Sequence, residues 1–312
     1  MGTQPQTADK NRTVDRLEDF NQQRSHLFAI AYRMLGSVMD AEDMVQETFL
    51  RWQQASASVI QSPKAYLTTI VTRLCIDYLR SARVQREQYV GPWLPEPIIT
   101  AKDADPIALA ELSESLSIAF LVLLERLSPL ERAVFLLREV FGYSYEDIGR
   151  IVAKNTVNCR QIARRSRQHI TLNKPRFQAD PQRQEQLTQQ FMQAFSRGNL
   201  QGLLDLLAED VAAWSDGGGK VVAALKPIYG ASKVARFLRA IQRRAQKLGW
   251  VYQMQLVQVN GQSGFVYAVE DVIQSVVSIV IVDDRIRVIY FVRNPAKLKP
   301  YMLSSLNEKI RK

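Results

Sequence analysis

Hydrophobic spacing changes character along this chain of 312 residues. From about residue 17 to 88, and again from about 112 to 173, apolar residues recur at the spacing of α-helices. Beyond residue 250 the pattern becomes the apolar–polar alternation of β-strands. The alternating segments are residues 250–259, 265–269, 273–282 and 285–292. We therefore predict a multidomain protein with two all-α helical domains, followed by an α+β domain with an antiparallel sheet.

Helix breakers and turn residues set the boundaries of these blocks. Three prolines within residues 92–97 rule out a helix there, so residues 89–110 are assigned to a linker. Pro175 ends the second helical block, and the Asn260–Gly261 and Asp283–Asp284 pairs have the composition of hairpin turns. Further helices are expected near residues 182–197, 199–208 and 231–248. The predicted domains are residues 17–88, residues 111–175 and residues 182–300.

Positive charge is concentrated in two short segments. The chain has a formal net charge of +10, yet residues 1–149 hold 15 Lys and Arg against 20 Asp and Glu. Residues 150–176 and residues 220–247 each hold 8 Lys and Arg and no acidic residue. Local basic surfaces of this kind are typical of contact with nucleic acid.

Cysteine usage and hydropathy predict a cytoplasmic protein. Cys75 and Cys159 have no second Cys or His at metal-ligand spacing, so we expect reduced packing residues, no metal and no cofactor. No apolar run is long enough to cross a bilayer, and residues 1–24 lack the apolar core of a secretory signal. We accordingly expect no membrane association.

Residues 144–167 carry the clearest functional signal. Ser144 is placed to cap a short helix, and Asn155 is placed to cap a second one after a break at residues 153–154. A short helix, a tight turn and a basic second helix form the helix-turn-helix that reads the major groove of DNA. The buried stripe of the second helix is predicted to be Cys159, Ile162, Ala163, Ser166 and Ile170. The outward positions are predicted to be Asn158, Arg160, Gln161, Arg164, Arg165 and Gln168. A helix that is merely solvated would usually carry acidic residues as well.

Two N-terminal helices present contrasting faces. Residues 40–52 predict a helix whose apolar side is buried and whose opposite side carries Asp40, Asp43, Gln46, Glu47 and Leu50. Such a face is usually solvated, but it also suits docking on a basic partner helix. Residues 63–83 predict a second long helix, in which arginines and two tyrosines suit unpaired DNA.

Together these segments resemble the extracytoplasmic-function group of sigma-70-type factors. Residues 40–52 are similar to that family's core-polymerase-binding helix, and residues 63–83 to its minus-ten-element helix. Residues 127–168 resemble the region that binds the minus-thirty-five element. The segment from Tyr89 to Pro97 (YVGPWLPEP) resembles that of a subgroup in which a SnoaL-like domain follows. Asp216–Lys220 (DGGGK) and Arg293–Leu298 (RNPAKL) resemble the C-terminal signatures of the same subgroup.

The resemblance implies promoter-specific transcription initiation, with bacterial core RNA polymerase and promoter DNA as partners and no catalysis by this chain. Core polymerase would meet Asp40, Asp43, Gln46, Glu47 and Leu50. The minus-ten region would meet Arg73, Asp77, Arg80 and Arg83. The minus-thirty-five element would meet Asn158, Arg160, Gln161, Arg164 and Arg165. One departure is Ala153–Lys154, where the family commonly has glycine, so the turn must close without the residue that most easily adopts a positive φ.

The resemblance further implies that the last domain is a cone-shaped SnoaL-like barrel, a fold whose relatives include small isomerases and hydrolases. It would act as a built-in regulator that docks on the sigma core and receives a small-molecule or protein signal. Asp216 is expected in a capping or turn role, with a pocket carboxylate as the alternative. Glu209 and Asp210 are expected at a helix end. The residues assigned to the linker and the C-terminal pocket are Trp93, Pro95, Trp214, Asp216 and Lys220.

Two other classes of protein stay open. One is a helix-turn-helix regulator that binds DNA without core polymerase, which would need neither the acidic face nor the tyrosine-bearing helix. The other is a SnoaL-like enzyme with a DNA-binding leader. The chain's two histidines, His26 and His169, lie outside the last domain, which argues against acid–base catalysis there.

Overall fold

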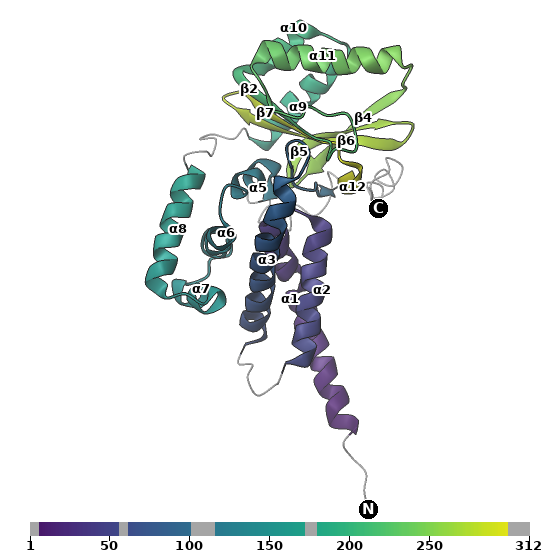
Figure 1. The fold of residues 1–312 in the computed structure, drawn as a ribbon. Coiled ribbons are helices and arrows are strands. Elements are labelled where there is room, and N and C mark those ends of the chain that lie inside the picture. Colours follow the sequence, from purple (N-terminus) through teal and green to yellow (C-terminus); the bar gives the residue numbers. More distant parts are fainter. Residues whose placement is uncertain (1–5, 56–61, 101–115, 172–179, 299–312) are drawn as a thin grey trace, which may run out of the picture. The chain divides into compact units, whose positions relative to one another are not determined.

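The computed structural model describes residues 6–55, 62–100, 116–171 and 180–298. Its internal contacts divide the chain into two compact units (Figure 1). The first unit comprises Met1–Gln85 and Leu123–Asn173, and the second comprises Arg86–Val122 and Lys174–Lys312. The segment that the sequence assigns to a linker therefore belongs to the same unit as the C-terminal domain.

The first unit is helical within its described residues. Its helices are α1 (Gln6–Leu35), α2 (Val38–Gln54), α3 (Pro63–Glu87), α6 (Pro129–Phe135), the π-helix η2 (Leu136–Val140), α7 (Tyr145–Val152) and α8 (Thr156–Thr171). Helix α5 (Ile118–Leu124) spans the boundary between the units. Several starts are fixed by side-chain caps: Ser37 accepts from the amide of Asp40, and Ser128 forms a capping box with Glu131.

The apolar stripes of this unit form its core as the sequence predicts. Ala41, Val45, Thr48 and Trp52 are the buried residues of α2. The Trp52 indole donates to the Arg16 carbonyl on α1 at 2.9 Å, so the buried ring also satisfies its one donor. Arg132 on α6 is buried and donates through Nη1 to the Met34 carbonyl and to Glu125. This contact joins the two helical blocks within the unit.

The turn of the helix-turn-helix closes with Ala153 in the left-handed region, at φ +53° and ψ +51°. Its amide still bonds to the Gly149 carbonyl, which ends α7. A Cβ at Gly149 would lie 2.7 Å from the Lys154 carbonyl oxygen. The turn thus depends on glycine at 149 for space, and it strains the alanine at 153.

Replacing Ala153 with glycine is expected to stabilise the first unit by about 0.5–1 kcal/mol. Glycine adopts a positive φ without the Cβ clash, and this gain exceeds its extra entropy in the unfolded chain. Urea unfolding followed by circular dichroism measures the change. Gln168→Gly, in the exposed interior of α8, is the control and should lose about 1 kcal/mol. An equal loss in both variants would contradict the strain at Ala153.

The second unit is a curved seven-stranded sheet with helices against it. In chain order it contains β1 (Ile99–Thr100), α9 (Pro181–Ser196), α10 (Leu200–Leu206), β2 (Leu207–Asp216), β3 (Ile228–Tyr229), α11 (Ala231–Lys247), β4 (Tyr252–Val259), β5 (Gln262–Val269), β6 (Val272–Val282), β7 (Arg285–Val292) and α12 (Pro295–Leu298). The strand order is β1-β4-β5-β6-β7-β2-β3. All neighbouring strands are antiparallel except β2 and β7, which are parallel.

The four alternating segments are strands β4 to β7, and both predicted hairpin turns are present. Asn260, Gly261, Asp283 and Asp284 all have positive φ, as two-residue hairpin loops require. The sequence pattern misses the long strand β2 and the two-residue strands β1 and β3. Glu209 and Asp210, expected at a helix end, lie within β2, and the predicted antiparallel sheet therefore contains one parallel pair. A register shift between Leu207 and Ala212 breaks the alternation that would have revealed this strand.

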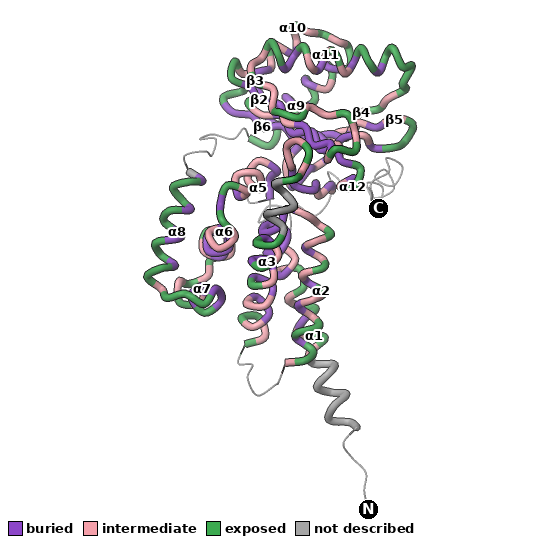
Figure 2. The backbone as a smooth tube through the Cα atoms, viewed as in Figure 1, coloured by how far each residue is buried: buried purple, intermediate pink, exposed green. Residues whose placement is uncertain are grey.

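The sheet has an apolar core on each face, and most strand residues are buried (Figure 2). On one face, side chains of α9, α10 and α11 pack with Phe265, Val277 and Phe291. On the other, Leu94 and Ile99 of the linker and Ile118 of α5 pack against the strands. The linker segment thus supplies part of the core of the C-terminal domain.

Candidate functional site

The exposed face of α2 combines carboxylates with apolar side chains. Asp43, Gln46 and Leu50 are exposed, whereas Asp40 and Glu47 are half-buried. Leu50 is 51% exposed and the neighbouring Met39 is 67% exposed. Glu47 pairs with Arg51 at 2.8 Å on the same surface, an exposed pair that contributes little to stability. The five residues predicted to meet core polymerase therefore lie on one helix, away from its buried stripe.

Helix α3 contributes a basic residue that contacts the helix-turn-helix. Arg73 donates through Nε to the Ile151 carbonyl at 2.7 Å and through Nη2 to the Arg150 carbonyl at 3.0 Å. These carbonyls belong to the last turn of α7, where a cation is favoured by the helix dipole. Asp77 and Arg80 form an exposed ion pair of 3.2 Å with each other. The Arg83 side chain lies outside the described residues. In this structure Arg73 is thus engaged by protein groups of the second helical block.

A half-buried histidine provides another contact between the two helical blocks. His26 Nε2 on α1 lies 3.0 Å from the Tyr143 hydroxyl, which in turn lies 3.1 Å from the Thr68 hydroxyl on α3. The imidazole also meets the Phe141 ring edge-on, with centroids 5.3 Å apart. Burial, reinforced by the positive charges of Lys64 and Arg33, lowers the pKa of His26 from 6.5 to about 4.

The depressed pKa of His26 predicts acid sensitivity in the first unit. Between about pH 6.5 and pH 4 the unfolded chain binds a proton that the folded chain does not, so stability falls as pH falls through this window and is fully present above it. The expected loss is about 2 kcal/mol, after allowance for the part of the ring that water reaches. Denaturant unfolding at a series of pH values measures it. His26→Gln should flatten the dependence in this window, whereas His169→Gln, an exposed change on α8, should leave it intact.

Helix α8 presents the basic face that the sequence predicts. Cys159, Ile162, Ala163, Ser166 and Ile170 are buried as one stripe. Asn158, Arg160, Gln161, Arg164 and Arg165 are all exposed. The predicted caps are present, because Ser144 accepts from the Asp147 amide at 3.1 Å and Asn155 from the Asn158 amide at 2.8 Å. The outward residues of the second helix are therefore free of the core and share one face of the helix.

In the second unit, the carboxylate of Asp216 gathers groups from three segments of the sequence. Asp216 is fully buried at the end of β2. Its Oδ1 accepts from the Tyr89 hydroxyl at 2.5 Å, and its Oδ2 accepts from the Leu94 amide at 2.9 Å and from Lys297 Nζ at 2.7 Å. We call Tyr89, Trp93, Leu94, Asp216, Asn294 and Lys297 the Asp216 clasp. It joins the linker, β2 and α12.

The remaining contacts of the clasp close the arrangement. Asn294 Nδ2 donates to the Tyr89 hydroxyl at 2.9 Å, and Lys297 Nζ also donates to the Leu94 carbonyl. The Lys297 ammonium lies 4.2 Å from the centroid of the Trp93 ring, a cation–π contact in a largely buried place. Burial, followed by the hydrogen bond to Asp216, raises the pKa of Tyr89 well above its usual range, so its hydroxyl stays a donor. The polar side-chain groups of Tyr89, Asp216, Asn294 and Lys297 thus all have partners.

The glycines after Asp216 leave room for this arrangement. Gly218 has φ +58°, and a Cβ there would lie 2.3 Å from Asn294 Nδ2 and 3.0 Å from the Tyr89 hydroxyl. Gly217 is equally confined, since its Cβ would lie 2.6 Å from the Val221 carbonyl oxygen. The DGGGK segment is therefore a tight turn whose glycines let the linker approach closely.

A second anchor holds the linker farther along. The Asn260 amide donates to the Ile98 carbonyl at 2.8 Å, and its side-chain oxygen accepts from the Ile98 amide at 2.9 Å. Its Nδ2 donates to the Leu116 carbonyl at 2.9 Å. Asn260 is 1% exposed, and β1 pairs with β4 beside it. Both described ends of the connection between the helical blocks are thus fixed on the C-terminal domain.

The predicted linker and pocket residues are brought together only in part. Trp93 and Asp216 meet at Lys297, and Pro95 is buried in the same linker segment. Trp214 packs with the core on the linker side of the sheet, while Lys220 is exposed. Asp216 accepts hydrogen bonds from the linker instead of capping a helix or turn.

Sequence reasoning left Tyr89, Asn294 and Lys297 out of the site, although each lies in a segment that resembles the subgroup. The three segments are residues 89–97, 216–220 and 293–298, and the sequence alone gives none of them a separate function. This combination could have indicated that the three segments contact one another.

Neither buried cysteine is disulfide-bonded, and burial raises the pKa of the Cys75 thiol far above its usual range. Within the described ranges, no group of His, Cys, Asp and Glu residues is suited to hold a metal ion. Helices long and apolar enough to cross a membrane are likewise absent from the described part of the chain.

Comparison with known proteins assigns the two helical blocks. Residues 20–84 match the Sigma-70 region 2 family, and residues 117–170 match the Sigma-70 region 4 family. The ECF RNA polymerase sigma factor SigJ of Mycobacterium tuberculosis is 38% identical over 250 residues, which cover 80% of each chain. The chain therefore belongs to the extracytoplasmic-function (ECF) sigma factors of RNA polymerase.

The similarity to ECF sigma factors also includes the C-terminal domain that follows the sigma regions. The crystal structure of SigJ from M. tuberculosis matches 91% of this chain and 98% of its own, with a TM-score of 0.74 and 32% identity. The probable ECF sigma factor SigI of the same organism is 34% identical over 213 residues, 68% of this chain and 71% of its own length. The helical sigma regions are thus followed by a strand-rich SnoaL-like domain, as the sequence predicts.

Proposed function

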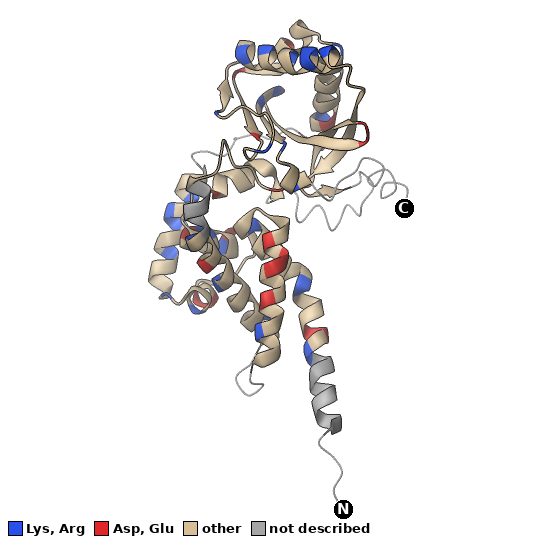
Figure 3. Cartoon of the chain, turned by 45° about the vertical axis from the view of Figure 1, so that its right-hand side comes forward, with Lys and Arg blue, Asp and Glu red and all other residues tan. Residues whose placement is uncertain are grey.

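We propose that this chain directs core RNA polymerase to specific promoters, with residues 17–88 and 111–175 as its two sigma domains. The acidic and apolar face of α2, from Asp40 to Leu50, would dock on core polymerase. Arg73, Asp77, Arg80 and Arg83 on α3 would follow the minus-ten region. The exposed residues of α8, from Asn158 to Arg165, would contact the minus-thirty-five element, with the N-terminal ones at base edges and the later arginines at phosphates. The observation that carries the proposal is the outward basic face of α8 (Figure 3), whose residues are exposed and include no acid.

We further propose that residues 182–300 regulate this activity by holding the linker between the sigma domains. The support is the Asp216 clasp, together with the second anchor at Asn260. A tether fixed at both ends restricts the separations that its two attached domains can reach. Sigma domains that read two separate promoter elements need such freedom. The domain would thereby act within the chain as a separate inhibitor would act in trans.

Arg73 supports a closed state of the first unit. Its guanidinium donates through Nε and Nη2 to α7 carbonyls, so these two donors are engaged by protein in this arrangement. Opening would exchange these two hydrogen bonds for contacts with promoter phosphates, which a cation makes equally well. The held linker would favour the closed arrangement and a released linker the open one.

Catalysis by the C-terminal domain is not part of this proposal. Asp216, the buried carboxylate of the domain's signature segment, accepts three hydrogen bonds and faces an ammonium, so it is not placed to remove a proton from a substrate. The proposed regulatory input is a small-molecule or protein signal, and the proposed location is the cytoplasm.

Run-off transcription with purified bacterial core polymerase tests the sigma function. A fragment from upstream of the chain's own gene serves as template, with and without the protein. We expect a specific transcript that requires the protein and that is lost with Asp43→Arg in the α2 face. Glu209→Arg, an exposed change of the same kind in the C-terminal domain, is the control and should keep it. DNA binding without association with core polymerase would contradict the proposal and favour a helix-turn-helix regulator that acts alone.

A further inference from the structure

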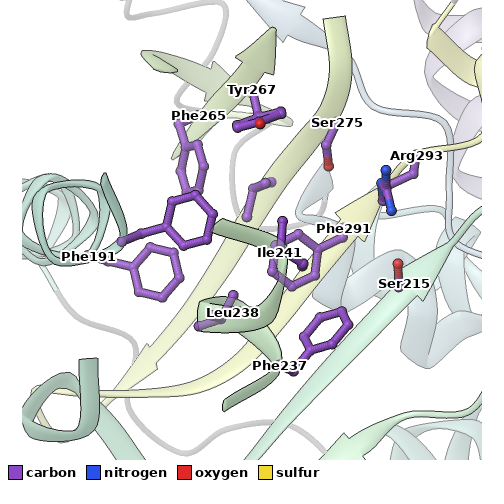
Figure 4. Close-up of a pocket in the computed structure, with 12 residues that line it drawn as sticks. Phe191, Ser215, Phe237, Leu238, Ile241, Phe265, Tyr267, Ser275, Phe291 and Arg293 are labelled. Atoms are coloured by element: carbon purple, nitrogen blue, oxygen red, sulfur yellow. The ribbon is translucent and has the colours of Figure 1, made fainter. Parts of the chain in front are cut away.

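The concave side of the sheet contains a cavity with aromatic walls (Figure 4). Phe191 and Phe195 of α9, Phe237 of α11, and Phe265 and Phe291 of the sheet line it. It lies on the opposite face of the sheet from the Asp216 clasp, because Ser215 lines it while Trp214 and Asp216 alternate to the linker side. The cavity is therefore distinct from the clasp.

Two hydroxyls in this cavity are buried without a hydrogen-bond partner. Ser215 on β2 is 2% exposed and Ser275 on β6 is 5% exposed, and within the described part of the chain nothing bonds to either Oγ. A buried hydroxyl without a partner is unfavourable by about 1–3 kcal/mol, so such groups usually mark a place for a ligand or a water. Serine is also an unusual choice in a wall made mainly of aromatic and aliphatic side chains.

Strand register places the two hydroxyls beside an arginine. Ser215 pairs with Phe291, Val277 pairs with Phe291, and Ser275 lies two residues from Val277 on the same face. Arg293 follows Phe291 by two residues and lines the same cavity. Figure 4 shows the three polar side chains on one side, with Phe191 and Phe265 across from them. The cavity thus has an apolar end and a polar, cationic end.

The arginine is held in place but is not neutralised. Arg293 donates through Nη1 to the Val222 carbonyl and forms no ion pair among the described residues. Burial, and then the positive charge of Arg244, lowers its pKa, so the site disfavours an unpaired cation. An anion at this end of the cavity would relieve that electrostatic penalty.

The cavity is small. The centres of water-sized spheres can occupy about 50 Å³ of it, several times the space that one water requires. That space, together with the surrounding rings, suits a flat molecule of a single ring. Larger ligands would require the walls to move.

We propose that this cavity binds a small aromatic carboxylate, with its ring among the phenylalanines and its carboxylate beside Arg293, Ser215 and Ser275. The guanidinium supplies charge-assisted hydrogen bonds, and the two hydroxyls find the acceptor they lack. The proposal rests on the proposed regulatory role only for its consequence in transcription. The binding itself is a property of the second unit.

Calorimetric titration and thermal unfolding of the full chain test it, with benzoate as the probe and benzyl alcohol as its uncharged counterpart. We expect saturable binding of benzoate, a raised melting temperature, and binding of benzyl alcohol weaker by about tenfold or more. Arg293→Met should weaken benzoate binding by about tenfold or more. Arg287→Met, an exposed change on β7, the strand that leads to Arg293, should leave it unchanged.

A second variant covers the case in which Arg293→Met fails to fold. Ser215→Ala with Ser275→Ala keeps the apolar packing and should weaken benzoate about threefold or more. The proposal is overturned if the wild-type chain shows no saturable binding of benzoate, phenylacetate or salicylate up to about 10 mM. It is also overturned if benzyl alcohol binds as tightly as benzoate, or if both cavity variants bind benzoate like the wild type. Because no polymerase is present, these results are independent of the transcription experiment.

Discussion

Replacing Asp216 with alanine is expected to lower the free energy of unfolding of the second unit by about 3–5 kcal/mol. The substitution leaves the Lys297 ammonium, whose side chain is 12% exposed, without its carboxylate partner. It also removes the acceptor for the Tyr89 hydroxyl and for the Leu94 amide. An unpaired buried charge and unsatisfied donors are among the few causes of so large a loss.

Guanidinium unfolding followed by tryptophan fluorescence measures this effect, since Trp93 belongs to the clasp. Asp210→Asn is the matched control: Asp210 lies on the same strand, is exposed, and pairs with Arg287 only at 3.6 Å. It should change stability by less than about 0.5 kcal/mol. Limited proteolysis should cleave the linker sooner in the Asp216 variant than in the control. Equal stability and equal cleavage in the two variants would show that the carboxylate does not hold the linker.

Replacing Arg160 and Gln161 together with alanine is expected to weaken promoter binding by the holoenzyme by about 2 kcal/mol or more, a factor of at least about 30. Both side chains are exposed near the start of α8, where a helix-turn-helix meets base edges. The loss should be confined to fragments that contain the cognate upstream element. Competition binding of specific and unrelated fragments at fixed salt gives the ratio.

Two further substitutions on α8 distinguish contacts with bases from sequence-independent contacts with phosphates. Arg164→Ala, three residues farther along, should weaken specific and unrelated DNA alike and lower the slope of affinity against salt by about one. Gln168→Ala, also exposed on α8, should change neither. A uniform loss of all DNA binding by the Arg160 and Gln161 variant would mean that these residues contact phosphates instead of bases.

Much of the helical part of the fold could be predicted because its determinants are local. The buried stripe of α8 and the caps at Ser144 and Asn155 follow from residue type and from 3.6-residue spacing. The hairpins of the sheet were equally local, since Asn260 and Asp283 tolerate the positive φ that their turns require. These elements appear in the structure where the sequence placed them.

The parts that sequence could not provide depend on distant contacts. Strand β2 pairs with β7 in parallel, some 80 residues away in the chain, and its bulge hides the alternation of inward and outward residues. The clasp unites positions 89, 216 and 297, and no local pattern indicates that Asp216 and Lys297 meet. Ser215 lies in the missed strand β2, and Ser275 resembles an ordinary polar strand residue, so only the strand register places both serines on the concave face.

The regulatory effect of the clasp is expected to correspond to a small free-energy change. Releasing the linker lengthens the flexible tether between the sigma domains, and each doubling of a flexible loop changes its closure free energy by only about 0.6 kcal/mol. A released linker should therefore favour separated domains by about threefold, with no new contact to DNA or polymerase. This is a modest effect of defined sign.

Run-off transcription by core polymerase with the wild-type chain, Asp216→Asn and Asp210→Asn tests this account most directly. Asp216→Asn keeps the size of the side chain but removes the charge that holds Lys297. With equal amounts of folded protein on one promoter, we predict about threefold more transcript from Asp216→Asn than from the wild type, and no change from Asp210→Asn. Equal or lower output from Asp216→Asn would contradict the claim that the C-terminal domain restrains the factor by holding its linker.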